Sequence, residues 1–197
     1  MPARLLSILF ILFLIGCGPG ESRKADQLFN QGKFKEAIAA YSHYISENPR
    51  SVGAIYNRGR AYEELGNYDQ AEQDFTKVSE LDEKNVNAYL SLAKLYYRQE
   101  LYTKALIYTE SALEINENSA DGYFLNARAQ HQLGYIDGAM ESYTLAIKIN
   151  KDYGEAYLYR GALKIHKNQT RSACEDFKKA ENLEVADASA ILKKYCK

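Results

Sequence analysis

Residues 52–85, VGAIYNRGRAYEELGNYDQAEQDFTKVSELDEKN, carry the pattern that decides the fold. Apolar residues recur at helical spacing in two segments of this stretch, and a short polar turn containing Gly66 separates them. Glycine adopts a positive φ angle without steric cost, which suits a turn between two helices. The stretch therefore predicts a hairpin of two α-helices.

The same pattern occurs five times along the chain with a period of 34 residues. Small residues allow two helices to cross at close range, and bulky aromatic residues fill the neighbouring gaps. The copies therefore predict five similar hairpins. An alanine column holds Ala37, Ala71, Ala105, Ala139 and Ala173; a small-residue column holds Ala25, Gly59, Ala93, Ala127 and Gly161; a largely aromatic column holds Tyr41, Phe75, Thr109, Tyr143 and Phe177.

These columns resemble the tetratricopeptide repeat (TPR) family. The family pattern is a large residue, a small one, an aromatic, alanine, an aromatic and alanine, and its positions in the second copy are Ile55, Gly59, Tyr62, Ala71, Phe75 and Val78. The resemblance implies an all-α fold, a right-handed α-solenoid of about five 34-residue hairpins. The five units lie within residues 22–187 and have the boundaries 18–51, 52–85, 86–119, 120–153 and 154–187.

Among the polar residues that depart from the family pattern, three have expected consequences for the fold. Gln130 and Lys164 stand at aromatic positions, so we expect them to weaken the last two units. Glu21 stands where a large apolar residue is expected, which predicts a short or frayed first helix.

Residues 188–197 are expected to form a capping helix, because a repeat array needs a terminal element to cover its last apolar face. Ile191, Leu192 and Tyr195 are spaced to do so. Cys196 follows them, and Cys174 lies in the last unit. The sequence leaves two interpretations of these cysteines open, a disulfide and a pair of buried free thiols.

The first sixteen residues differ in kind from the rest. Residues 5–15 are apolar except for Ser7, and a helix of that length rises about 16 Å, roughly half the hydrocarbon core of a bilayer. Such a run is too short to span a membrane and has the length of the apolar part of an export signal. Residues 1–16 therefore predict a cleaved signal peptide.

The end of this run, Leu14-Ile15-Gly16-Cys17, resembles the lipobox of bacterial lipoproteins. The resemblance implies that Cys17 receives a lipid and becomes the first residue of the mature chain. Residues 17–21 would then be a short tether to the membrane. The expected location is the bacterial cell envelope, with the protein anchored by lipid on the periplasmic face or the cell surface.

Charge and motifs exclude several classes of function. The chain has 26 acidic and 25 basic residues, so it has no strong overall field to attract nucleic acid. Its histidines, His43, His131 and His166, form no metal-binding motif, and no nucleophile or phosphate-binding motif is present. We therefore expect no enzymatic activity, no metal, no cofactor and no small-molecule substrate.

In the TPR family the first helix of each hairpin lines a concave groove, and the resemblance maps two columns onto it here. The apolar column is Tyr56, Leu90, Phe124 and Leu158; the basic column is Arg60, Lys94 and Arg128; Tyr97, Arg98 and His131 flank them. The columns suit protein or peptide partners, including acidic or C-terminal segments. The alternative is that the basic column only pairs with Glu63, Glu64, Asp121 and Glu155 on the same surface.

One subfamily is not expected. TPR domains that clamp the C-terminal carboxylate of heat-shock chaperones use a set of lysine, asparagine and arginine residues, and only Asn57 matches that set here. The favoured function is a membrane-anchored adaptor or scaffold that binds protein partners in the envelope. The alternative is a self-associating structural component of an envelope assembly or secretion complex.

Overall fold

The computed structural model describes residues 20–196, which form eleven α-helices and no β-strand. The all-α expectation is confirmed. The helices are α1 (Gly20–Asn30), α2 (Phe34–Glu47), α3 (Val52–Glu64), α4 (Tyr68–Leu81), α5 (Val86–Arg98), α6 (Tyr102–Ile115), α7 (Ala120–Gln132), α8 (Ile136–Ile149), α9 (Gly154–His166), α10 (Thr170–Asn182) and α11 (Ala188–Tyr195).

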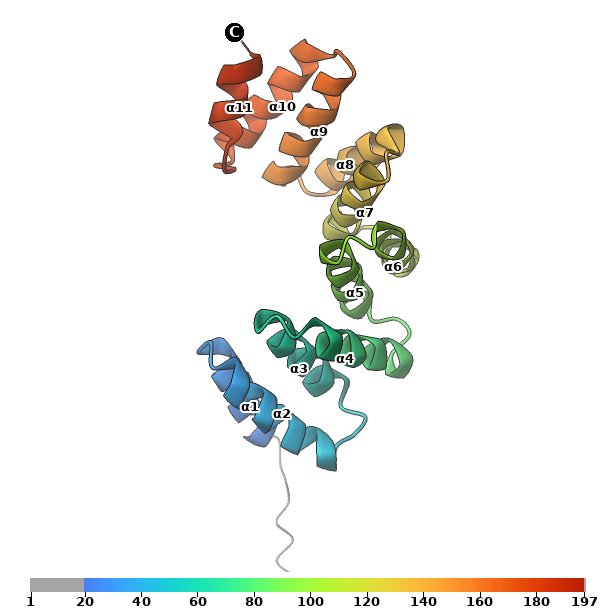
Figure 1. The fold of residues 1–197 in the computed structure, drawn as a ribbon, viewed down its shortest axis with the longest axis vertical. Helices are drawn as coiled ribbons and strands as arrows, with labels where there is room; N and C mark the ends of the chain where they lie inside the picture. The colour runs from blue at the N-terminus through green and yellow to red at the C-terminus, as the bar shows by residue number, and fades with distance from the viewer. Residues whose placement is uncertain (1–19, 197) are drawn as a thin grey trace, which may run out of the picture.

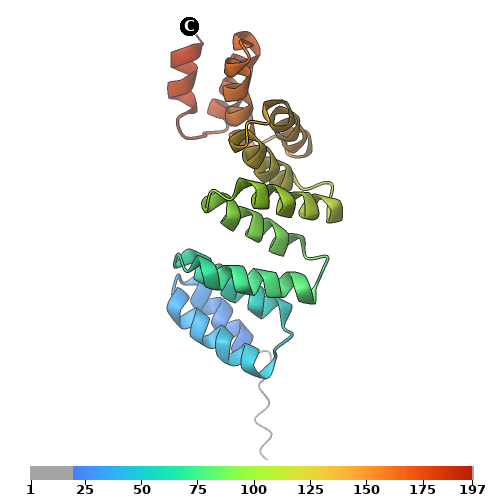
Figure 2. The same ribbon diagram turned by 45° about the vertical axis from the view of Figure 1, so that its right-hand side comes forward.

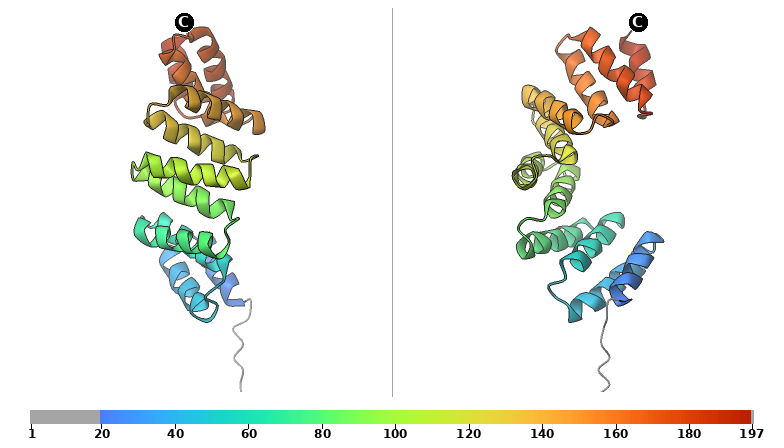
Figure 3. Two further views of the ribbon diagram at one scale, coloured as in Figure 1. Left: turned by 90° about the vertical axis from the view of Figure 1, so that its right-hand side faces the viewer. Right: turned by 180° about the vertical axis from the view of Figure 1, so that it is seen from behind.

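The first ten helices pair in chain order into five hairpins, and each hairpin packs on the next to build a curved α-solenoid (Figure 1). The hairpins follow one another as successive layers in Figure 2. Figure 3 shows the curvature from two further sides. Figure 1 places α5 on the inner side of the curve and α6 on the outer side. Helix α5, the first helix of its hairpin, therefore faces the concave surface.

The turn inside each hairpin contains one residue at positive φ. This residue follows the first helix closely and allows the chain to reverse direction. Four of the five turns use glycine or asparagine, the residue types that tolerate this conformation. The five residues are Gly32 (φ 73°), Gly66 (φ 74°), Glu100 (φ 61°), Gly134 (φ 79°) and Asn168 (φ 59°).

The small-residue column marks the places where the two helices of a hairpin nearly touch. A Cβ atom added to Gly59 would lie 2.8 Å from the Phe75 ring, and one added to Gly161 would lie 2.6 Å from the Phe177 ring. Both rings are fully buried. A side chain at either glycine would therefore force the aromatic ring out of its position.

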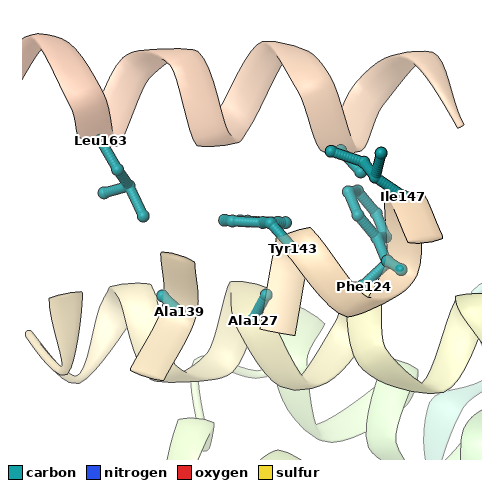
Figure 4. Close-up of a cluster of buried hydrophobic side chains, with 8 residues drawn as sticks. Phe124, Ala127, Ala139, Tyr143, Ile147 and Leu163 are labelled. Atoms are coloured by element: carbon teal, nitrogen blue, oxygen red, sulfur yellow. The ribbon is translucent and has the colours of Figure 1, made fainter. Parts of the chain in front are cut away.

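The core continues from one hairpin to the next. Figure 4 shows Tyr143 between α7 and α9, with Phe124 and Ile147 on one side and Leu163 on the other. These residues come from α7, α8 and α9. The apolar face of each hairpin is therefore covered by its neighbour, as stacking of repeats requires.

Two partly buried ion pairs lie between the helices of a hairpin at equivalent positions of the second and fifth units. Arg58 contacts Asp74 at 2.7 Å and Arg160 contacts Asp176 at 2.7 Å. Lys164 also contacts Asp176, at 2.7 Å, and its side chain is only 13% exposed. The aromatic position that Lys164 occupies is therefore compensated by an ion pair, which the residue pattern did not indicate.

Gln130, the other polar departure, is also satisfied by a partner. Its side-chain oxygen accepts a hydrogen bond of 3.2 Å from Ser142. Ser142 lies close enough to Asn126 to donate to it as well, at 3.1 Å, and Asn126 donates to the buried hydroxyl of Thr109 at 3.0 Å. A connected polar network thus replaces apolar packing between α6, α7 and α8.

The ends of the array differ from its middle. Helix α1 begins at Gly20, the first residue that the structure describes, so the expectation of a short or frayed first helix stays a prediction. Helix α11 packs on α10 as the expected cap, and Cys174 forms a disulfide with Cys196. Residues 1–16, Cys17 and most of the predicted tether lie outside the described residues. Within residues 20–196 no helix has the length and apolar character to cross a membrane.

Candidate binding cavity on the concave surface

A cavity of about 710 Å³ lies among the first helices of the second, third and fourth hairpins. Most of its lining comes from α5 and α7. The remaining residues are Tyr56 of α3, Glu100 between α5 and α6, Tyr102 of α6 and Tyr153, just before α9. The side chains of Asn85 and Ser119 cap α5 and α7 by accepting hydrogen bonds from the backbone amides of Ala88 and Gly122. These caps define where the two helices that carry the site begin.

Seven of the ten residues proposed from sequence for the groove line this cavity. They are Tyr56, Leu90, Lys94, Tyr97, Arg98, Phe124 and Arg128. The other three lie elsewhere. Arg60 is positioned over the ring of Phe29, 4.7 Å from its centroid. Leu158 lines a separate cavity of about 390 Å³ near the C-terminal end.

His131 is half-buried and does not line the cavity. Desolvation lowers the pKa of its imidazole, and the positive charges of Arg128 and His166 lower it further. The neutral imidazole is therefore favoured in the folded protein.

The structure adds residues that the two sequence columns did not include. Asn87 and Asp121 precede Leu90 and Phe124 by three positions, so they extend the same helical face and a third column would have identified them. Ser91 and Leu125 directly follow those two apolar residues in the chain. Glu100, Tyr102 and Tyr153 lie outside the first helices, and only the tertiary structure brings them to the cavity. The additional residues are Asn87, Ser91, Glu100, Tyr102, Asp121, Leu125 and Tyr153.

Aromatic rings form the apolar part of the cavity. The rings of Phe124 and Tyr153 stack with centroids 4.7 Å apart, and Tyr153 donates a 2.8 Å hydrogen bond to Asp121. Burial raises the pKa of Tyr153, and the bond to Asp121 raises it further. The hydroxyls of Tyr56 and Ser91 lie 3.2 Å apart, which joins α3 to α5. These contacts hold the rings in fixed positions before any ligand arrives.

Two of the cations in the cavity share one carboxylate. Lys94 lies 3.0 Å and Arg98 lies 3.4 Å from the same oxygen of Glu63, whose side chain is 10% exposed. Arg98 also lies over the ring of Tyr68. The alternative interpretation is that the basic residues only pair with acidic residues on the same surface. For Lys94, which pairs with Glu63, this interpretation holds.

Arg128 is held by aromatic rings instead. Its guanidinium lies 4.4 Å from the ring centroid of Tyr97 and 5.1 Å from that of Tyr159. It also donates a 3.0 Å hydrogen bond to the Tyr97 hydroxyl. Among the side chains that the structure describes, residues 22–196, no carboxylate lies within the 4.0 Å limit of an ion pair with Arg128. Its charge is therefore available to an anionic ligand group.

Comparison with known proteins identifies tetratricopeptide repeats along most of the chain. Tetratricopeptide repeat family models match residues 22–85, 56–120 and 120–153. The chain is similar to the crystal structure of MamA, with 26% identity, a TM-score of 0.75, and coverage of 84% of this chain and 96% of that chain.

Its fold is also similar to that of YrrB, which is described as a TPR protein with an unusual peptide-binding site. The identity is 21% and the TM-score 0.71, over 88% of this chain and 90% of that one.

Among curated proteins, the Hsp70-Hsp90 organizing protein of Triticum aestivum is 28% identical over 101 residues, which are 51% of this chain and 17% of that protein. The chain spans between 9% and 19% of the length of the first three curated relatives that it matches.

Proposed function

Because the chain belongs to the tetratricopeptide repeat family, whose fold is a scaffold for protein interactions, we propose that it binds a segment of a partner protein along the cavity of α3, α5 and α7. The binding requires no chemical reaction. The apolar side chains of Tyr56, Leu90 and Phe124 anchor the segment, and Arg128 binds an acidic side chain or a C-terminal carboxylate.

The observation that carries this proposal is the state of Arg128. A guanidinium that is fixed by two aromatic rings and a hydroxyl, yet has no carboxylate partner in the described part of the chain, is already oriented for an anion. Binding such an anion costs little side-chain entropy. Lys94 and Arg98, by contrast, would first have to give up part of their interaction with Glu63.

Site-directed photo-crosslinking in cells tests this proposal. A photoreactive phenylalanine analogue at Leu90, inside the cavity, should form crosslinks to a partner protein. The same group at Gln73, an exposed position on α4 outside this cavity, is the matched control and should not form them. Arg128→Gln should abolish the crosslinks from Leu90. Equal crosslinking from both positions, or crosslinking that does not change in the Arg128 variant, would contradict binding in the cavity.

We further propose that the protein is a lipoprotein of the bacterial envelope, anchored through Cys17. The support is the apolar run of residues 5–15 and the lipobox-like residues 14–17 that end it. Two or more acyl chains provide a stable anchor, whereas a single chain binds only marginally. Cys17→Ser should abolish incorporation of labelled palmitate and release the protein from membranes. An unchanged membrane fraction in this variant would refute the anchor and leave the cavity proposal intact.

A further inference from the structure

Residue 100 is unusual for its position in the repeat. The equivalent turn residue is Gly32, Gly66 or Gly134 in three of the other hairpins, with φ angles of 73° to 79°. The fifth hairpin has Asn168 at 59°. The third hairpin has Glu100 at 61°, so a long side chain occupies a left-handed conformation.

The fold alone does not favour glutamate there. A Cβ atom is disfavoured at positive φ, and glycine and asparagine are the residues that tolerate it. Glu100 is the one glutamate among the five hairpin turns, although Glu184, in the turn after α10, also has a positive φ of 57°. What distinguishes Glu100 is therefore its location in the molecule, not its backbone conformation alone.

Glu100 is one of the residues that line the cavity, and it also lines a smaller one of about 220 Å³. Of the five turn residues, Glu100 alone lines the larger cavity, between Arg98 and Tyr102 in the chain. Within residues 20–196 no lysine or arginine lies within the 4.0 Å limit of an ion pair with Glu100. The nearby Arg98 is directed to Glu63 and to the ring of Tyr68. Glu100 thus contributes no internal ion pair to the fold.

The cavity therefore presents separate charges of opposite sign. Glu100 is at the end where α5 turns into α6, and Arg128 is on α7 among the aromatic rings. Neither charge is paired with the other or with another ionised side chain of the described residues. A ligand segment with only acidic groups would satisfy Arg128 and would be repelled by Glu100.

We propose that Glu100 is a specificity-determining residue of the cavity, and that it binds a lysine or arginine side chain of the partner segment. The inference rests on the proposed function. The preferred partner is a segment that combines a basic residue at Glu100 with apolar residues and an acidic group at Arg128.

A positional-scanning library of acetylated ten-residue peptides, prepared both with a free C-terminal carboxylate and with a C-terminal amide, tests this inference, with purified wild type, Glu100→Gln and Glu100→Gly. The wild type should select lysine or arginine at one peptide position. Both variants should reduce that selection at least fivefold and keep the selection of apolar residues. Glu117→Gln, which removes an exposed carboxylate outside the cavity, is the matched control and should behave as wild type.

Thermal unfolding provides an independent measurement. Glu100→Gly should raise the melting temperature by about 2–4 °C, because glycine relieves the strained turn. Glu100→Gln retains a Cβ atom and should not raise it. The inference is overturned if the wild type selects peptides without any basic preference, or if Glu100→Gln keeps that preference. If the wild type selects no residue at any peptide position, the proposed function itself fails.

Discussion

The guanidinium of Arg128 lies 4.4 Å from the centroid of the Tyr97 ring and donates a hydrogen bond of 3.0 Å to the hydroxyl of the same residue. The two side chains come from α7 and α5 and are 31 residues apart in the chain. This contact links consecutive hairpins at the floor of the cavity and keeps a positive charge on its concave side. It also distinguishes Arg128 from Lys94 and Arg60, the other members of the basic column.

Arg128→Gln should weaken the binding of a peptide selected from the library by about 10- to 100-fold, the range for losing a charged hydrogen bond. Helix content by circular dichroism should not change, because the side chain is only partly buried. Fluorescence anisotropy of the labelled peptide measures the affinity. The matched control is Arg60→Gln, since Arg60 contacts Phe29 outside the cavity, and it should change the affinity less than twofold. An equal loss in both variants would show that the whole basic column acts together.

Gly161→Ala should destabilise the fold by about 1–3 kcal/mol, because the new methyl group would lie 2.6 Å from the buried ring of Phe177. Urea unfolding measures the change. Gly53→Ala in α3 is the control, since no atom lies within 4 Å of the added Cβ, and it should stabilise the protein by up to about 1 kcal/mol. Stability that is unchanged in the Gly161 variant would contradict the close helix crossing.

Replacing both Cys174 and Cys196 by serine should lower the free energy of unfolding by about 3 kcal/mol, as expected for a loop of 22 residues. The free energy measured for the wild type should fall by the same amount in a reducing agent, and the double variant should not respond to it. Peptide affinity should be preserved, because the cavity is built by earlier hairpins. A wild type that is insensitive to reduction would show that the cysteines are not bonded in solution.

His131 should make the protein less stable in mild acid. Desolvation places the folded-state pKa of His131 below the unfolded value of about 6.5. As the pH falls, His131 therefore binds a proton in the unfolded chain before it does so in the folded protein. The contribution of His131 to the free energy of unfolding is highest above about pH 6.5 and decreases as the pH falls toward the pKa of His131 in the folded protein. His131→Gln should make the melting temperature fall less between about pH 7.5 and pH 5. The prediction is wrong if the variant and the wild type lose stability equally over this range.

The polar residues show where the repeat pattern was informative and where it was not. The pattern located Gln130 and Lys164 at positions meant for aromatic side chains, but it could not identify their partners. Asp176 lies 2.7 Å from Lys164, and Ser142 donates to Gln130. Those pairings depend on the side-chain directions of two packed helices, which a single column of a repeat does not specify.

The sequence by itself determined the all-α fold, the five hairpins, the turns at Gly32, Gly66 and Gly134, and the helical face on which Leu90 and Phe124 lie. Period and residue size suffice for these features, because each depends on contacts within one hairpin or between a hairpin and its neighbour.

Only the tertiary structure decided which charges remain available to a ligand. Arg60, Lys94 and Arg128 occupy equivalent positions in the repeat, but their surroundings differ. Arg60 contacts the ring of Phe29 outside the cavity, Lys94 pairs with Glu63, and Arg128 is held by aromatic rings. Glu100 and Tyr153 also line the cavity, although both lie outside the first helices. Availability depends on which groups surround a charge in three dimensions, and the positions surrounding equivalent residues differ from one repeat to the next.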